Sequence, residues 1–139
     1  MSNCWLNGKT CVVTGASGGM GAGIAATLIK KHGCKVIGVA RSEPKMIKFI
    51  EELGPTYAEQ FSYKLFDVSK KENWDNFVEK LQADGVKVDI LVNNAGILPK
   101  FKRFDRYDMD EIERAININF YSCVYSIKAM PVSYTHLTL

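Results

Sequence analysis

The strongest structural signal in this chain is the stretch Thr10-Cys-Val-Val-Thr-Gly-Ala-Ser-Gly-Gly-Met-Gly21. Its first five residues are apolar enough to predict a short buried β-strand over residues 10–14. A helical pattern follows the glycines from Gly19 to His32, and Gly33 is a residue type that commonly ends a helix. A strand that leads through glycines into a helix predicts the first unit of a parallel α/β fold.

The glycine-rich turn also predicts a dinucleotide-binding site. Gly15 permits a tight turn after the strand, whereas Gly19 and Gly21 leave out Cβ atoms where a pyrophosphate approaches the backbone and where helix meets sheet. The first N–H groups of the helix are then available to bind phosphate. Glycines also form ordinary turns, but the position of this turn between a strand and a helix favours the nucleotide site.

The rest of the chain alternates apolar runs with helical patterns, which predicts a parallel sheet with helices on both faces. Three more strands are expected over residues 35–40, 61–66 and 86–92. Three more helices are expected: one that begins at Ser42 or Pro44 and ends before Gly54, one that begins with a capping box of Ser69 and Glu72, and a long one over residues 108–129. Short, right-handed connections predict a doubly wound α/β fold with strand order 3-2-1-4.

Each of these later helices has a stripe at helical spacing that we expect to face the core. The stripes are Met46, Ile47, Ile50 and Leu53; then Trp74, Phe77, Val78 and Leu81; then Ile112, Ile116, Asn119, Cys123 and Ile127. Asn119 is therefore expected to be a buried amide, which needs hydrogen-bond partners. Asn117 points to another side of the helix and is expected to be solvated.

Length and composition predict one ordinary globular domain. The chain has 139 residues, of which 47% are hydrophobic and 24% charged, enough for a hydrophobic core. A net charge of +3 is too small to indicate a nucleic-acid-binding protein. The basic cluster Lys100, Lys102, Arg103 and Arg106 is expected to be a solvated loop, with a phosphate- or acid-binding site as the alternative.

The sequence gives no sign of a membrane or secreted protein. No stretch approaches the roughly 18 apolar residues of a membrane helix, and the N-terminus lacks the segments of a signal peptide. The cysteines, Cys4, Cys11, Cys34 and Cys123, show no CxxC pairing. We therefore expect free, partly buried thiols in a cytoplasmic protein without a metal site.

Residues 14–21 fit the pattern TGxxxGxG, which resembles the cofactor fingerprint of the compact, classical short-chain dehydrogenases/reductases (SDRs). Extended relatives, such as nucleotide-sugar epimerases, usually have the spacing TGxxGxxG. Three further matches follow in the family's order: Asp67-Val68, Asn93-Asn94-Ala95-Gly96 and Asn119. The resemblance covers residues 6–130. It implies a Rossmann-like domain of an oxidoreductase that transfers a hydride between NAD(P)(H) and a small-molecule carbonyl/alcohol pair, commonly as a homodimer or homotetramer.

The resemblance also assigns roles to single residues. Cofactor binding in the turn falls on Gly15, Ser17, Gly18, Gly19, Met20 and Gly21. Asp67 is implied to accept a hydrogen bond from the adenine amino group beside the backbone of Val68, with a helix cap as the alternative role. The segment Asn93-Asn94-Ala95-Gly96 is implied to line the nicotinamide ribose, although such a run also forms plain turns. Asn119 is implied to hold a water molecule that relays protons, and the alternative is an amide tied only to neighbouring backbone.

The end of the second strand predicts the cofactor. NAD-binding folds place a carboxylate there, about 20 residues beyond the glycines, to bind the ribose 2′-hydroxyl. Here the residues are Ala40, Arg41 and Ser42. A guanidinium pairs with the 2′-phosphate that a carboxylate would repel, so Arg41 and Ser42 favour NADP(H) over NAD(H). The basic residue that the family often carries inside the glycine motif is absent, because Gly18 stands there.

The family's catalytic Ser and Tyr-x-x-x-Lys have no match, since no tyrosine of this chain has a lysine four residues later. We therefore expect an N-terminal fragment of an SDR, truncated after the fourth strand and the long helix and inactive by itself. In such a fragment the fourth strand keeps an open edge and the stripe from Ile112 to Ile127 loses its cover. The alternative is a non-catalytic nucleotide-binding or regulatory SDR relative.

Residues 1–130 are expected to form the NAD(P)-binding domain, and residues 131–139 to be foreign to it. The tail PVSYTHLTL breaks the helical pattern and has no apolar periodicity. Its residues 132–137 can be read back as GTC TCT TAT ACA CAT CTG, which resembles a transposon end used to build sequencing libraries. We expect the genuine sequence to stop near Met130 and the tail to be an artefact of library preparation.

Overall fold

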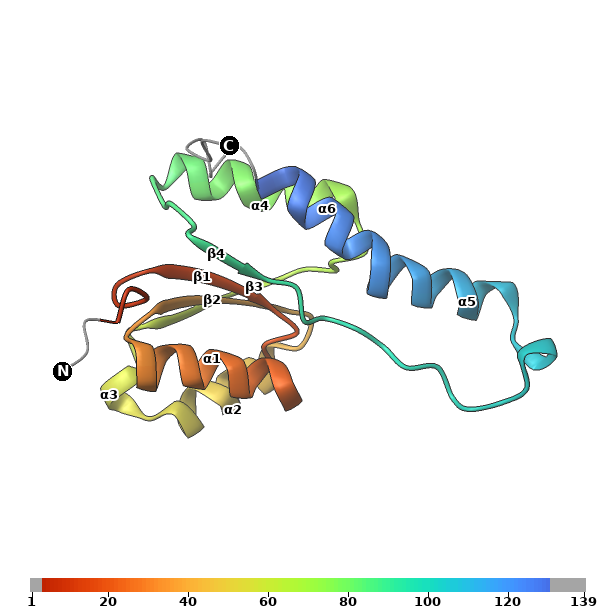
Figure 1. The fold of residues 1–139 in the computed structure, drawn as a ribbon, viewed down its shortest axis with the longest axis horizontal. Coiled ribbons are helices and arrows are strands. Elements are labelled where there is room, and N and C mark those ends of the chain that lie inside the picture. Colours follow the sequence, from red (N-terminus) through yellow and green to blue (C-terminus); the bar gives the residue numbers. More distant parts are fainter. Residues whose placement is uncertain (1–3, 131–139) are drawn as a thin grey trace.

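A parallel sheet of four strands forms the centre of the structure, a computed structural model that describes residues 4–130 (Figure 1). The strands are β1 (Thr10–Thr14), β2 (Lys35–Ala40), β3 (Phe61–Leu65) and β4 (Ile90–Val92). Their order is β3-β2-β1-β4, and every neighbouring pair is parallel. The predicted strand order and the doubly wound α/β class are confirmed.

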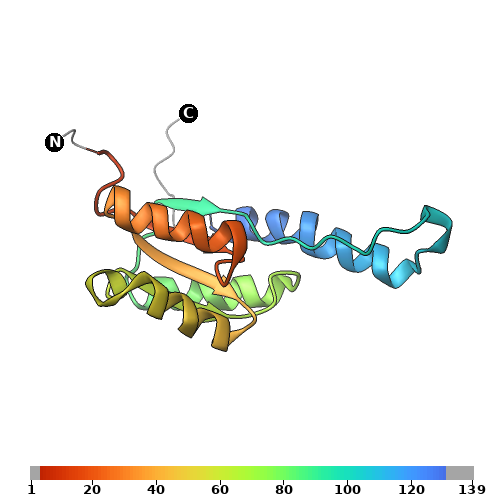
Figure 2. The ribbon, with the colours of Figure 1, turned by 90° about the horizontal axis from the view of Figure 1, so that it is seen from below.

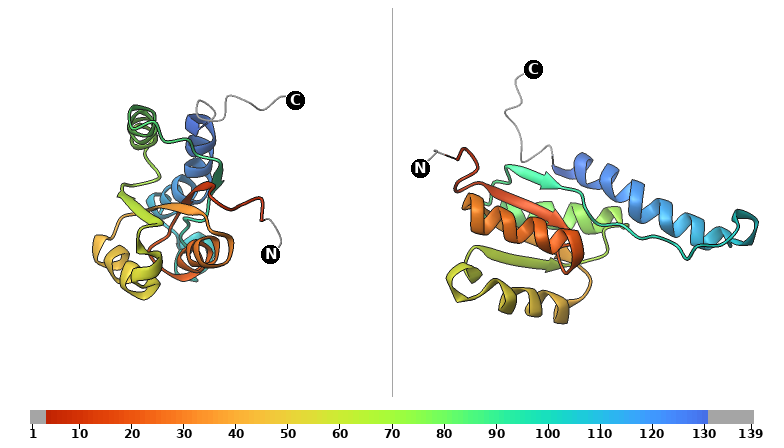
Figure 3. Two further views of the ribbon diagram at one scale, coloured as in Figure 1. Left: turned by 90° about the vertical axis from the view of Figure 1, so that its left-hand side faces the viewer. Right: turned by 60° about the horizontal axis from the view of Figure 1, so that its bottom comes forward.

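Helices cover both faces of this sheet. They are α1 (Gly19–His32), α2 (Glu43–Leu53), the short α3 (Pro55–Ala58), α4 (Lys71–Ala83), α5 (Met109–Ile116) and α6 (Ser122–Ala129). The first two lie on one face, and α4 and α6 lie on the other (Figures 1 and 3). The view from below shows that α5 extends past the end of the sheet (Figure 2). Among the described helices, none is long and apolar enough to cross a bilayer.

Alternating side chains of the strands build two separate cores. Cys11 and Val13 of β1 pack with α1 and α2, whereas Val12 packs with α4, and all three are fully buried. The alternation follows from the two-residue period of a strand. Because both faces are covered, the central strands are apolar throughout. Cys11 and the buried Cys34 are free thiols, as expected.

The helix α2 buries a different side chain from the one predicted. Ile47 is 47% exposed, and Phe49 is buried in its place together with Met46 and Leu53. These three buried positions are separated by three and four residues, so they share one face of the helix. The ring of Phe49 meets that of Phe61 edge-on, with centroids 4.9 Å apart. Such an aromatic contact stabilises this face as the core face.

The strand β4 is shorter than expected, because it pairs only over Ile90–Val92 instead of residues 86–92. Val88 is already fully buried. Asp89, which lies between Val88 and the start of β4, binds the start of β1. Its N–H donates to the carbonyl of Thr10 (2.9 Å), and its carboxylate accepts from the N–H of Thr10 (3.0 Å). A side-chain oxygen thus takes the place of a ladder hydrogen bond at this point.

The start of α4 also differs from the prediction, although its core face does not. The helix begins after Lys70 without a side-chain cap, and Ser69 donates instead to Asp67 Oδ1 at 2.7 Å. The predicted capping box of Ser69 and Glu72 is therefore wrong, since the hydroxyl is engaged before the helix begins. The predicted face of Trp74, Phe77, Val78 and Leu81 is buried, as expected.

The long helix occupies nearly the expected span, and its stripe from Ile112 to Ile127 is half-buried or exposed, as expected for the 139-residue chain. It runs from α5 through a π-helical turn, Asn117–Tyr121, into α6. Ile116 and Ile127 are 46% and 59% exposed, and Asn119 is also exposed. The prediction of a buried Asn119 is therefore wrong. A π-helical turn holds more residues than an α-helical one, so a 3.6-residue pattern loses its register across it.

The buried face of this helix contains two serines, Ser122 and Ser126, with Ile118 and Met130. The hydroxyl of Ser122 donates to the carbonyl of Ile118 at 2.6 Å, and that of Ser126 donates to Asn93 Oδ1 at 2.8 Å. Both hydroxyls are thus satisfied, which is the condition for burying a polar group. The predicted tail, residues 131–139, lies outside the described residues.

Candidate nucleotide-binding site

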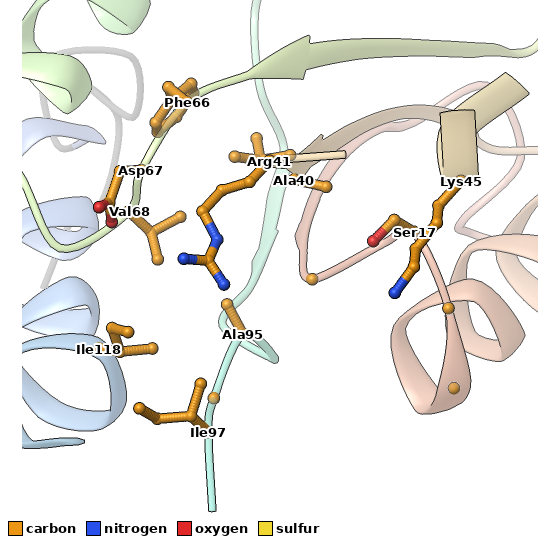
Figure 4. A pocket seen from close by; sticks show the side chains of 15 residues that line it. Ser17, Ala40, Arg41, Lys45, Phe66, Asp67, Val68, Ala95, Ile97 and Ile118 are labelled. Atoms are coloured by element: carbon orange, nitrogen blue, oxygen red, sulfur yellow. The ribbon is translucent and has the colours of Figure 1, made fainter. Parts of the chain in front are cut away.

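A hollow of about 390 Å³ opens at the carboxyl ends of the strands (Figure 4). Parallel α/β sheets bind their ligands at this edge. The predicted site residues that line it are Gly15, Ser17, Gly18, Gly19, Arg41, Asp67, Val68, Ala95 and Gly96. The predicted residues outside its lining are Met20, Gly21, Ser42, Asn93, Asn94 and Asn119. The sequence motifs therefore meet in one place, although they are far apart along the chain.

The glycine turn after β1 depends on backbone that only glycine adopts readily. Gly15 has a φ of +68° and Gly19 a φ of +54°. A Cβ on Gly21 would lie 2.1 Å from the carbonyl oxygen of Gly15, so the first turn of α1 packs directly on the turn's backbone. A Cβ on Gly18 would meet no protein atom within 4 Å. Its absence leaves open space inside the hollow.

The start of α1 offers backbone donors beside that space. Gly18 is the N-cap residue, no side chain caps the helix, and its first turn contains no acidic residue. The first N–H groups of a helix have no partner within the helix and carry a partial positive charge. Met20 lies in this first turn and is 80% exposed, and its backbone N–H is one of the groups that could bind an anion.

Thr14, at the end of β1, holds the segment that follows β4, and sequence reasoning missed it. Its Oγ1 accepts hydrogen bonds from the N–H groups of Asn94 (3.0 Å) and Ala95 (2.9 Å). The amide of Asn94 donates in turn to the carbonyl of Thr14 at 3.0 Å. Thr14 is almost fully buried. The available signal was a hydroxyl residue at the end of an otherwise apolar strand, which needs a buried partner.

The amide side chains of the segment after β4 are bound by the protein itself. Asn93 Oδ1 accepts from Ser126 of α6, and Asn94 binds Thr14. The parts of this segment that line the hollow are therefore Ala95 and Gly96. The segment is thus both a turn and part of the lining, the two roles considered for it from the sequence. The asparagines fix the turn, and the turn presents its backbone to the hollow.

Asp67 lies across the hollow from the glycine turn and is held as a carboxylate (Figure 4). Partial burial acts to raise its pKa, but the hydrogen bonds that its Oδ1 accepts from the hydroxyl and the N–H of Ser69 act against this, as does the charge of Arg41. The net result is a pKa below the ordinary value. Both hydrogen bonds use Oδ1, and among the described residues Oδ2 has no hydrogen-bond donor.

Two basic side chains enter the hollow near the end of β2. Arg41 follows Ala40 directly, and its guanidinium points into the hollow (Figure 4). Lys45, in the first turn of α2, lines the hollow near Ser17 and was missed by sequence reasoning. The sequence feature that could have indicated Lys45 is a lysine in the first turn of the helix that follows β2. Ser42 precedes α2 as its N-cap residue, outside the lining.

Comparisons with known proteins identify oxidoreductases that are similar to this chain. Benzil reductase ((S)-benzoin forming) IRC24 of Saccharomyces cerevisiae is 33% identical over 122 residues, which cover 84% of this chain and 45% of that protein. An uncharacterized oxidoreductase of Staphylococcus aureus strain MRSA252 is 35% identical over 126 residues, with 89% of this chain and 52% of that protein covered. The chain thus spans about half the length of the curated relatives it matches.

Solved structures match over a similar share. The alcohol dehydrogenase of the archaeon Thermococcus sibiricus, complexed with 5-hydroxy-NADP, is 34% identical with a TM-score of 0.79, covering 90% of this chain and 52% of that one. A putative gluconate dehydrogenase of Agrobacterium tumefaciens has a TM-score of 0.85 at 26% identity, covering 93% and 50%. The family model for short chain dehydrogenase matches residues 9–133. With its fold, its glycine turn and this match over most of its length, the chain belongs to the short-chain dehydrogenase/reductase family of oxidoreductases.

Proposed function

We propose that this chain is the NADP(H)-binding part of an oxidoreductase that acts on a carbonyl/alcohol pair. The observation that carries the proposal is the guanidinium of Arg41 in the hollow, next to Ala40, where NAD-binding folds place a carboxylate. A guanidinium favours a 2′-phosphate over a 2′-hydroxyl, because it forms charge-assisted, bidentate hydrogen bonds. The Thermococcus sibiricus relative was solved with 5-hydroxy-NADP, which supports the same choice.

The residues of the hollow fit such a cofactor. Open space at Gly18 and the uncapped start of α1 suit a pyrophosphate. Under this proposal the pyrophosphate side is held by Gly15, Ser17, Gly18, Gly19, Met20 and Gly21. Arg41 and Ser42 bind the 2′-phosphate, and Asp67 and Val68 bind the adenine. Asn93 and Asn94 hold the segment in which Ala95 and Gly96 line the nicotinamide ribose. When bound, the cofactor supplies or accepts the hydride.

We place most of the proton chemistry outside this chain. Asn119 is its one candidate for proton relay, and the Tyr-x-x-x-Lys pair of the family has no match in the 139 residues. Under the proposal, residues 1–130 are the nucleotide-binding domain of an enzyme whose complete reading frame carries that pair. The second candidate is a non-catalytic nucleotide-binding or regulatory relative.

The test has two parts. The purified chain should bind NADP⁺ more tightly than NAD⁺ in calorimetric titrations, and equal affinities, or no binding, would contradict the cofactor proposal. The chain should show no NADP(H)-dependent turnover across a panel of carbonyl compounds, and reproducible turnover free of host reductases would overturn the proposed location of the chemistry. A complete reading frame without Tyr-x-x-x-Lys would decide for the non-catalytic relative.

We further propose a homodimeric or homotetrameric, cytoplasmic parent protein. The exposed apolar residues Phe120 and Ile127 on the long helix support an oligomer. The free thiols of Cys11 and Cys34 are the form that cysteines keep in a reducing compartment. Size-exclusion chromatography with light scattering of the complete protein tests the first point, and fluorescence localisation tests the second.

A further inference from the structure

Lys45 brings a second positive charge to the nucleotide hollow from a separate element. It lines the main hollow together with Ser17, Gly18 and Gly19. The same four residues also line an adjoining hollow of about 420 Å³ between the glycine turn and α2. In the close view the Lys45 side chain extends from α2 toward Ser17 (Figure 4). Its ammonium group is thus placed between α2 and the turn.

The charges around Lys45 leave it available for an anion. On the same helix, Lys48 pairs with Glu52 at 3.7 Å, and Glu43 accepts a hydrogen bond from the hydroxyl of Tyr63 at 3.1 Å. Within residues 4–130, Lys45 and Arg41 form no ion pair with a carboxylate. The hollow is therefore lined by two cations that form no ion pair among the described residues, although the charge of Arg41 also acts on the carboxylate of Asp67.

A 2′-phosphate needs more charge than Arg41 alone provides. A phosphate monoester carries about −1.5 to −2 charges near pH 7, whereas a guanidinium carries one positive charge. The glycine turn between Thr14 and Gly21 contains no basic residue, so a second cation at this site would come from another element. A lysine binds phosphate as a point charge and does not need the bidentate geometry of an arginine.

We propose that Lys45 is a specificity-determining residue, the second cation of a 2′-phosphate subsite that it forms with Arg41. The subsite selects nucleotides with a phosphate on the adenosine ribose. This inference rests on the proposed NADP(H) binding, and the experiment below separates the two.

The experiment measures binding of two probes to the purified chain by isothermal titration calorimetry. The probes are adenosine 2′,5′-bisphosphate and adenosine 5′-monophosphate, which differ only in the 2′-phosphate. Lys45→Ala should weaken the bisphosphate about tenfold and leave the monophosphate nearly unchanged, while Lys45→Arg should retain most of the affinity. Lys48→Ala is the matched control, because it removes the same charge one turn further along α2.

Each outcome decides something. The role of Lys45 would be overturned if Lys45→Ala weakened both probes equally, or if Lys45→Ala and Lys48→Ala had equal effects. In either case, the cofactor proposal would still stand if the wild-type chain preferred the bisphosphate. A wild-type chain without that preference would overturn both. Lys45 is exposed, so circular dichroism should show the same fold and melting temperature in all variants.

Discussion

The side chain of Asn119 binds the backbone of Ile97 with two hydrogen bonds. Its Oδ1 accepts from the N–H of Ile97 at 2.7 Å, and its Nδ2 donates to the carbonyl of Ile97 at 2.8 Å. The π-helical turn of the long helix is thereby joined to the loop after β4. Since Ile97 also lines the nucleotide hollow, this amide positions one wall of the candidate site.

Replacing Asn119 by Ala should destabilise the fold by about 1–2 kcal/mol, because two hydrogen bonds to backbone are lost near the surface. Urea unfolding measures this change. Asn117→Ala is the control, since Asn117 is an exposed amide in the same turn. In an active, longer protein that contains this domain, Asn119→Ala should also lower turnover and leave cofactor affinity nearly intact. Unchanged turnover with a lower melting temperature would decide for a purely structural amide.

The sequence pattern was sufficient for the sheet but insufficient for the long helix. Strand order followed from short apolar runs joined by helices, and the structure has that order. The buried face of the long helix was not predicted, because it contains Ser122 and Ser126. Their hydroxyl groups acquire hydrogen-bond partners only in the folded chain. Similarly, the motifs located most of the hollow, but Lys45 lies outside them, and Thr14, the first residue of TGxxxGxG, had no role assigned to it. Their roles depend on which neighbours the fold brings to them.

A glycine pair on α1 tests the packing of the turn. Gly21→Ala should destabilise the chain by roughly 1–3 kcal/mol, because the new Cβ would lie 2.1 Å from backbone oxygen of Gly15. Gly23→Ala, two residues later, meets nothing within 4 Å and should stabilise the helix by up to about 1 kcal/mol. Urea unfolding of both variants gives the comparison. Shifts of the same sign would contradict the tight contact between α1 and the turn.

Arg41 is expected to read the 2′-phosphate. Arg41→Ala should weaken NADP⁺ roughly ten- to a hundredfold, the value of a lost charged hydrogen bond, and should change NAD⁺ affinity little. The same titrations on Arg106→Ala, in the exposed basic loop, control for a general loss of positive charge. Equal losses for both cofactors in Arg41→Ala would show that the guanidinium does not discriminate between them.

The lowered pKa of Asp67 predicts a pH dependence of stability. An unfolded aspartate titrates near 3.8, and the folded carboxylate titrates below that value. Asp67 therefore stabilises the fold above this pH, and the contribution is lost as the pH falls through the folded pKa. Compared with Asp67→Asn, the wild-type chain should lose its advantage in unfolding free energy in that acidic range. Glu59→Gln, an exposed position, is the control, and an advantage that stays constant with pH would contradict the assignment.

The exposed side of the long helix should make the chain self-associate. Ile116, Phe120, Val124 and Ile127 of the long helix are 46%, 59%, 38% and 59% exposed. Within the described residues, β4 also pairs with β1 alone and keeps one open edge, a second surface prone to association. We expect sedimentation velocity to show association that increases with protein concentration.

Two charge-matched double variants separate these surfaces. Phe120→Lys with Ile127→Lys places charges on the apolar face, whereas Thr56→Lys with Gln82→Lys adds the same charge at other exposed positions. The first pair should restore a monomer and the second should not. Association that persists equally in both pairs would assign it to the open edge of β4, and equal rescue by both would assign it to net charge. A wild-type chain that stays monomeric at every concentration would show that neither the apolar face of the long helix nor the open edge of β4 causes self-association.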